Sequence, residues 1–85
     1  MGEKEIGRVT HWFGHIGVAG IELSDSLNVG AKIKVRGHTT DFESVVDSMQ
    51  IEREDVETAG PGDDIGVKFA ERARIHDKVY LVESE

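Results

Sequence analysis

The segment that decides the fold is Ala31-Lys32-Ile33-Lys34-Val35-Arg36-Gly37, in which apolar and cationic side chains alternate. Successive side chains of a β-strand point to opposite faces of the sheet, so Ile33 and Val35 face one way and the three cations face the other. The segment therefore predicts a half-buried strand with an aliphatic inner face and a cationic outer face.

Five other segments read as strands and are separated by turn residues at spacings of about 10 residues. With 31–37 included, the expected strands cover about 5–13, 16–23, 31–37, 42–52, 64–69 and 78–83. In 42–52 the apolar positions change parity between Val45 and Val46, which predicts a bulge or bend, because a shift of one residue flips every later side chain. The acid-rich stretch 53–63 is expected to be a turn region, in which a short turn near 54–59 would fit and no helix is required.

Short strands with glycine at the corners and no convincing amphipathic helix favour an all-β fold. Closing the sheet would remove the exposed edges that a flat sheet of so short a chain leaves open to aggregation. We therefore expect a single domain over residues 1–85, with its core at about 6–82, folded as a closed six-stranded antiparallel barrel of the Greek-key type.

Length and composition limit the classes of protein to consider. The 85 residues are 38% hydrophobic and only 6% aromatic, which suits one domain with a small aliphatic core. The absence of cysteine excludes disulfides, thiolate zinc sites and cysteine nucleophiles. The longest uncharged stretch, 9–21, is shorter than the roughly 20 apolar residues of a membrane span, and Glu3 and Glu5 stand where a signal peptide would be cationic. We expect a soluble, cytoplasmic chain with no membrane partner.

The net charge of −7 opposes general, charge-driven binding to nucleic acid. The charge is unevenly distributed, however, because two cationic islands flank the acidic tract 41–64. The candidate nucleic-acid contacts in these islands are Lys32, Lys34, Arg36, Arg72, Arg74 and Lys78. Cations at alternate positions of one strand repeat about every 6.8 Å, close to the phosphate step of an extended strand. The alternatives are outer-face cations that keep a sheet edge soluble, and surface ion pairs with Glu71 and Asp77.

Trp12 and Phe13 are adjacent at the end of the first strand, so one of them is expected to face outward. An exposed ring there could stack on a base or dock on a protein partner, and the alternative is a ring that lies over the mouth of a barrel.

Motifs for catalysis and for cofactors are absent from the sequence. The glycine cluster 14–20 lacks the Gly-Lys-Ser or Gly-Lys-Thr ending of a phosphate-binding loop, so the chain is not expected to bind GTP. No Gly-Xaa-Ser-Xaa-Gly nucleophile elbow occurs. His11 and His15 have the spacing of a helical metal pair, but they fall in an expected hairpin without a third ligand nearby. We expect no enzyme activity, no cofactor and no metal.

Several short motifs carry a resemblance to a known family. The sequence is similar to the second domain of translational GTPases such as elongation factor Tu through Gly7-Arg8-Val9-Thr10, Gly17-Val18-Ala19-Gly20-Ile21-Glu22-Leu23 and Ala59-Gly60-Pro61-Gly62-Asp63. Through Gly37-His38-Thr39-Thr40-Asp41-Phe42 it more closely resembles small translation-factor-like proteins and the barrel appended to collagenase-like peptidases. It departs from the family pattern at Ala31, where the family usually has aspartate, and at His76, where it usually has glycine.

The resemblance implies a non-catalytic binding module. The first hypothesis is a contact with tRNA, ribosomal RNA or a translation or RNA-modification protein through the cationic outer face. The alternative is a protein-interaction or accessory barrel that works with a separate enzyme. Either form is expected to be a monomer or a weak dimer.

Overall fold

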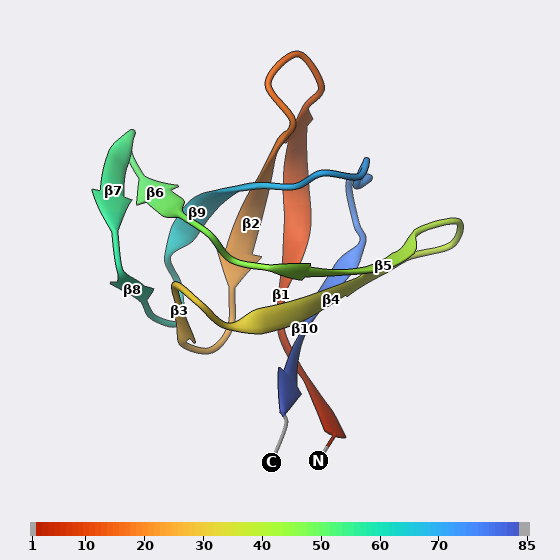
Figure 1. Cartoon of the computed structure of the whole chain (residues 1–85), viewed down its shortest axis with the longest axis horizontal. Coiled ribbons are helices and arrows are strands. Elements are labelled where there is room, and N and C mark those ends of the chain that lie inside the picture. Colours follow the sequence, from red (N-terminus) through yellow and green to blue (C-terminus); the bar gives the residue numbers. More distant parts are fainter. Residues whose placement is uncertain (1, 84–85) are drawn as a thin grey trace.

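The structure, a computed structural model, describes residues 2–83, and within that range it consists of strands joined by turns and loops (Figure 1). The expected all-β class is confirmed. The strands are β1 (Gly2–Phe13), β2 (Val18–Leu23), β3 (Leu27–Asn28), β4 (Lys32–Arg36), β5 (Asp41–Val45), β6 (Met49–Ile51), β7 (Glu54–Val56), β8 (Thr58–Ala59), β9 (Asp64–Lys68) and β10 (Lys78–Glu83). No helix in this described part of the chain could cross a membrane.

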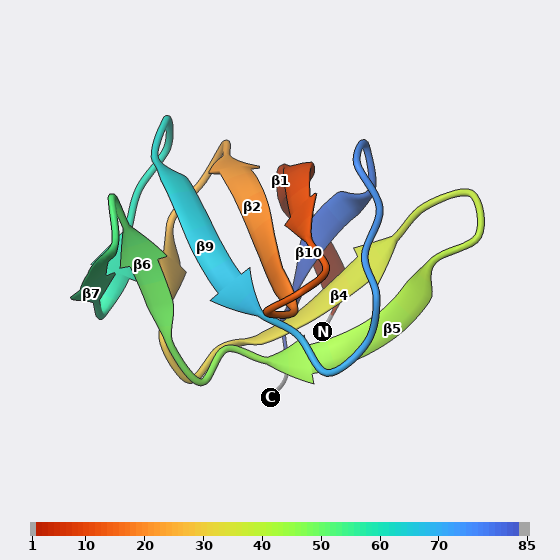
Figure 2. The same ribbon diagram turned by 90° about the horizontal axis from the view of Figure 1, so that it is seen from above.

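Eight of the strands form one strongly curled antiparallel sheet in the order β5-β4-β10-β1-β2-β9-β6-β7, and β3 pairs with β8 (Figure 2). The hydrogen-bonded order has two ends, β5 and β7, so the sheet differs from the expected closed ring of six strands. The sheet has eight strands because the expected strand 42–52 is divided into β5 and β6 and because the expected turn region 53–63 contains β7. The separate pair consists of β8, also from 53–63, and β3, which was not expected.

The division of segment 42–52 occurs at the predicted bend. Phe42 is buried and Val45 is half exposed, whereas after the bend Met49 is buried. The first part of the segment, β5, pairs with β4, and the second part, β6, pairs with β9. The change of parity in the sequence therefore marks the place where the chain leaves one neighbour and joins another.

The core is aliphatic, as the composition predicts. Its fully buried members come from β1, β2, β3, β4, β9, β10 and the bend after β5, and they include Ile6, Val9, Ile21, Leu27, Ile33, Val35, Val46, Ile65, Val67 and Val79. Phe42 and Phe69 add an edge-to-face ring contact with a centroid distance of 5.3 Å. Ile33 and Val35 point inward from β4, and Ile65 and Val67 point inward from β9, as their alternation predicts.

The expected turn region 53–63 is wrong in part, because β7 forms a hairpin with β6 and β8 pairs with β3. The amide of Gln50 donates to the carboxylate of Asp55 at 3.0 Å across the hairpin. β7 and β8 are only three and two residues long, so they carry no alternation of apolar residues that a sequence could reveal.

His76 occupies a backbone conformation that glycine favours, with φ of 78°. The carboxylate of the next residue, Asp77, is buried and accepts a hydrogen bond from the backbone N–H of Arg74 at 2.8 Å. The turn before β10 therefore holds His76 in the left-handed conformation that the usual glycine would adopt at this position.

Candidate functional site

The cationic outer face of β4 exists as predicted, but its charges are matched by acids on the adjacent strand β5 and on β1, two strands away. The Lys34 side chain is only 18% exposed and lies near Glu3 of β1 and Asp41 of β5. Arg36 also lies over the ring of Tyr80, with 5.9 Å between the guanidinium carbon and the centroid. The ion pairs, with their N···O distances, are Lys32–Glu43 (3.3 Å), Lys34–Glu3 (3.7 Å), Lys34–Asp41 (3.9 Å) and Arg36–Glu3 (3.1 Å).

The topology explains this matching. β10 and β5 flank β4, and β1 follows β10, so acids near the start of the chain reach cations in its middle. Exposed pairs of this kind contribute at most about 1 kcal/mol each to stability, but they cancel the local field that phosphate binding needs. The arrangement favours the alternative of ordinary outer-face cations over the prediction that they contact RNA, although the ion pairs of these three residues were not expected.

The second cationic island is divided by the structure. Lys78 starts β10, where it is in register with Arg36 of β4 and lies 3.9 Å from Glu5. Arg72 and Arg74 are exposed on the loop between β9 and β10. The alternative in which these arginines pair with Asp77 through their side chains does not hold the loop, because the Asp77 carboxylate accepts the backbone N–H of Arg74 at 2.8 Å.

The two neighbouring aromatic residues separate as expected, one inward and one outward. Trp12 is partly buried and packs against the core, whereas Phe13 is 50% exposed. On the outer face of β1, the Phe13 ring is stacked with the ring of His11 at a centroid distance of 5.9 Å. His15 is exposed in the following turn.

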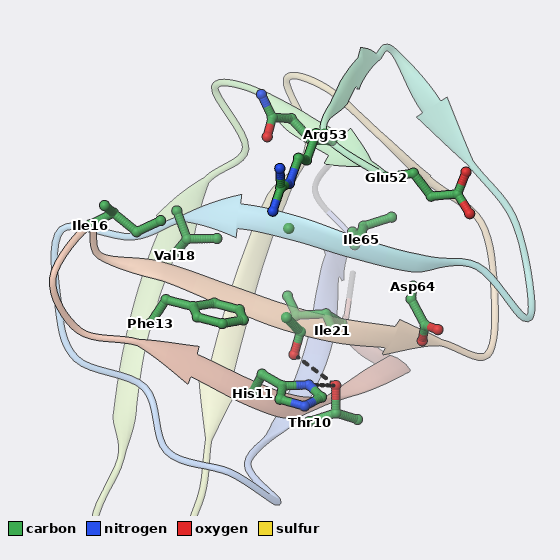
Figure 3. A pocket seen from close by; sticks show the side chains of 13 residues that line it. Thr10, His11, Phe13, Ile16, Val18, Ile21, Glu52, Arg53, Asp64 and Ile65 are labelled. Atoms are coloured by element: carbon green, nitrogen blue, oxygen red, sulfur yellow. Dashed lines mark hydrogen bonds between the residues drawn. The ribbon is translucent and has the colours of Figure 1, made fainter.

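An open groove of about 720 Å³ lies beside the stacked rings, on the outer face of β1, β2, β9 and β6 (Figure 3). One row of register partners crosses it: His11 of β1 pairs with Gly20 of β2, Gly20 pairs with Gly66 of β9, and Gly66 pairs with Gln50 of β6. The two central positions carry no side chain, so the backbone of two adjacent strands forms the floor. We call Gly20 and Gly66 the glycine floor.

The ends of the groove differ in chemistry. Phe13, Ile16 and Val18 line one end, and Ile16 is 60% exposed although it is aliphatic. Glu52 and Asp64 line the other end. Figure 3 shows the apolar side chains and Asp64 at opposite ends of the strands that carry the glycine floor.

Arg53 reaches over the groove from the turn between β6 and β7 (Figure 3). Glu52 and Arg53 form this turn with φ of 53° and 68°. A two-residue hairpin turn with both residues left-handed normally uses Asn-Gly, because other side chains are strained there. Within residues 2–83, Arg53 makes no ion pair or hydrogen bond through its side chain.

Sequence reasoning missed the groove. The sequence contained only an indirect sign of the groove. Gly20 and Gly66 each interrupt an apolar run, and a glycine inside a strand can mark a place where another backbone approaches closely. Their alignment depends on the pairing of β2 with β9, which joins residues more than forty positions apart in the sequence. Among residues 2–83, no three His, Asp or Glu side chains converge as metal ligands, and the expected lack of catalytic and cofactor residues stays a prediction.

Comparisons with known proteins bear on the role of this fold. No protein-family profile matches the sequence. Over 79 residues the chain is 46% identical to an uncharacterized protease of Methanocaldococcus jannaschii; the match covers 92% of this chain and 19% of that protein. The chain thus spans about a fifth of the length of the curated relative that it matches.

Two solved structures share the fold. The C-terminal domain of a protein assigned as a U32 peptidase in Geobacillus thermoleovorans superposes with a TM-score of 0.88, at 14% identity, over 94% of this chain and 93% of that one. Its selenomethionine variant gives 0.84, at 15% identity, over 89% and 96%. These comparisons support the resemblance to a barrel appended to peptidases, while the likeness to elongation factor Tu stays a prediction. The chain is therefore similar in fold to a C-terminal domain of a U32 peptidase and similar in sequence to part of a protease.

Proposed function

We propose that this chain is a non-catalytic accessory domain that docks on a peptidase. The observation that carries the proposal is the 46% identity to a 79-residue part of a protease that is about five times longer than the match. The shared fold with a C-terminal peptidase domain supports the same role. Catalysis would then belong to the rest of such an assembly, and this chain would contribute a surface.

The character of the surface supports a protein partner over RNA. Most of the cations that were predicted to contact phosphates form ion pairs with acids on β5 and β1. Exposed apolar side chains gather instead at one end of the groove, at Phe13 and Ile16. Clustered apolar exposure next to polar side chains is typical of protein interaction sites.

Docking can be tested by grafting. We would replace the matched stretch of the Methanocaldococcus jannaschii protease with this chain and compare amide hydrogen exchange in the graft and in the isolated chain. Docking should slow exchange of amides on one face by about tenfold or more, since the docked face opens less often. The control is this chain fused through a flexible Gly/Ser linker to an unrelated folded protein.

Two outcomes would contradict the proposal. One is an exchange pattern in the graft that equals the pattern in the control fusion, which would mean that the domain is only tethered. The other is saturable binding of labelled tRNA by the isolated chain that weakens steeply between 50 and 200 mM salt, the mark of phosphate contacts.

We also propose that segment 42–52 closes the curled sheet into a barrel. The chain runs directly from β5, at one end of the pairing order, to β6, which pairs with β9 near the other end. At the bend, the Val46 N–H donates to the carbonyl of Ala31 at 2.9 Å, and the Gly30 N–H donates to the carbonyl of Val46 at 2.7 Å. These two bonds continue the pairing of β4 with β5 into the bend.

Closure predicts strong protection at the bend. The Val46 amide should exchange as slowly as the amides of the central strands, because its bond is part of the cooperative sheet. Exposed Ser48, two residues later, is the internal reference for a fast amide. Exchange of Val46 at the rate of Ser48, measured by NMR, would show that the seam is open.

A further inference from the structure

The acidic end of the groove has an incomplete charge balance. Glu22 of β2 and Asp64 of β9 are direct register partners, and like charges placed opposite each other are destabilising. Arg8 pairs with Glu22 at 3.4 Å. Asp64 forms no side-chain ion pair or hydrogen bond in the described part of the chain, and Glu52 lines the same end. This end is therefore suited to a cationic group from outside.

The glycine floor gives access to the space between the two ends. A Cβ atom at Gly66 would lie 3.3 Å from a methyl group of Val18, and one at Gly20 would lie 3.1 Å from the Cβ of His11. Any side chain at these positions would fill the groove. Their absence leaves a flat strip of backbone on which an extended chain could lie, below the five N–H donors of Arg53.

Resting on the docking function proposed above, we propose that the groove binds an extended segment of the protein partner that carries an apolar side chain and a Lys or Arg. The apolar side chain contacts Phe13 and Ile16, the cation pairs with Asp64, and the Arg53 guanidinium donates to carbonyl oxygens of the bound segment. The net charge of −7 attracts a basic segment while it diffuses toward the groove.

The geometry also sets a spacing within the ligand. The apolar row at Val18 and the acidic row at Glu22 are four residues apart on β2, which is about 13 Å along a strand. A bound segment in extended conformation therefore places its apolar residue and its cation about four positions apart. RNA fits less well, because its phosphates would meet two acids at one end of the groove. Within residues 2–83, Arg53 is the single Lys or Arg that lines it.

The probe is a capped seven-residue peptide of serine and threonine with leucine and lysine four positions apart, titrated into the isolated chain labelled with ¹⁵N. Saturable shifts are expected at Gly20, Gly66 and Asp64, with a dissociation constant near 1 mM for so short a ligand. Exchanging the lysine for glutamate, or the leucine for serine, should weaken binding about tenfold each. Equal binding by all three peptides, or shifts on another face, would overturn the proposal.

Variants of the chain sharpen the test. Gly66→Val fills the floor and should abolish binding, Asp64→Asn should weaken it about tenfold, and Arg53→Gly should weaken it while relieving the strained turn. Asp47→Asn removes an exposed acid that does not line the groove and should leave binding unchanged. Thermal midpoints verify that each variant is folded. Equal effects of Asp64→Asn and Asp47→Asn would reduce the interaction to unspecific charge attraction and would overturn the proposal.

The outcome can be separated from the docking proposal itself. In the graft experiment, protection centred on the glycine floor supports both proposals. Protection centred on the outer face of β4 would sustain docking and overturn the assignment of the groove. A seven-nucleotide single-stranded RNA that shifts the groove amides more strongly than the leucine–lysine peptide would identify a nucleic acid as the occupant and would also overturn the assignment.

Discussion

Replacing Gly7 by alanine is expected to lower the free energy of unfolding by about 3 kcal/mol, the upper range for overpacking a dense interior. A Cβ atom at this position would lie 2.6 Å from the backbone carbonyl oxygen of Glu22 and 3.1 Å from a methyl group of Ile21. The carbonyl belongs to β2, which is paired on both sides, so it cannot move aside without disturbing the sheet. For a domain of this size the thermal midpoint should fall by roughly 15 °C.

The matched control is Gly14→Ala, in the turn after β1. A Cβ there would meet the Trp12 ring nitrogen at 3.4 Å, an ordinary van der Waals distance. The midpoint of this variant should stay within about 2 °C of the parent, as is usual for surface changes. If Gly7→Ala unfolds at the same temperature as Gly14→Ala, β1 and β2 are not as close at this point as the structure has them.

Replacing Gly37 by alanine should be comparably damaging, for a reason that involves a charge. A Cβ at Gly37 would lie 1.7 Å from Oδ1 of Asp77, a side chain that is only 4% exposed. The other carboxylate oxygen, Oδ2, is held by the backbone N–H of Arg74 at 2.8 Å. Moving the carboxylate breaks this part-buried bond and leaves the N–H of Arg74 without its acceptor, which costs about 1 kcal/mol in addition to the steric displacement.

A double-mutant cycle isolates the clash at Gly37. Asp77→Ala alone should destabilise by about 1–3 kcal/mol because Arg74 loses its acceptor. Adding Gly37→Ala to that variant should cost almost nothing more, since the atom it would strike is gone, and the coupling free energy should reach about 3 kcal/mol. Additive losses in chemical denaturation would mean that Gly37 contacts something other than this carboxylate.

The strands that a sequence can reveal are those with alternating apolar residues. β4 and β9 were predicted within a residue or two because Ile33, Val35, Ile65 and Val67 alternate with polar neighbours that face water. The bend at Val46 is predicted by the same alternation, because the apolar positions change parity there. In contrast β7, which is short and acidic, pairs through its backbone, and nothing in its side chains indicates the partner.

The candidate site was less predictable because it depends on which strands are neighbours. The cationic face of β4 follows from alternation alone, but its neutralisation by Glu3 depends on β1 lying two strands away, beyond β10. The glycine floor likewise requires the register of β2 against β9. Local pattern determines which face a side chain occupies, whereas long-range pairing determines what it meets there.

The adjacency of β1 and β10 has a consequence for how the domain acquires its structure. One of the two strands that pair with β1 is β10, and the pairing brings Gly2 into register with Glu83. During synthesis, β1 therefore cannot complete its pairing before residues 78–83 have left the ribosome. Topologies dominated by such distant pairings fold in milliseconds to seconds, so this small domain should fold slowly for its length.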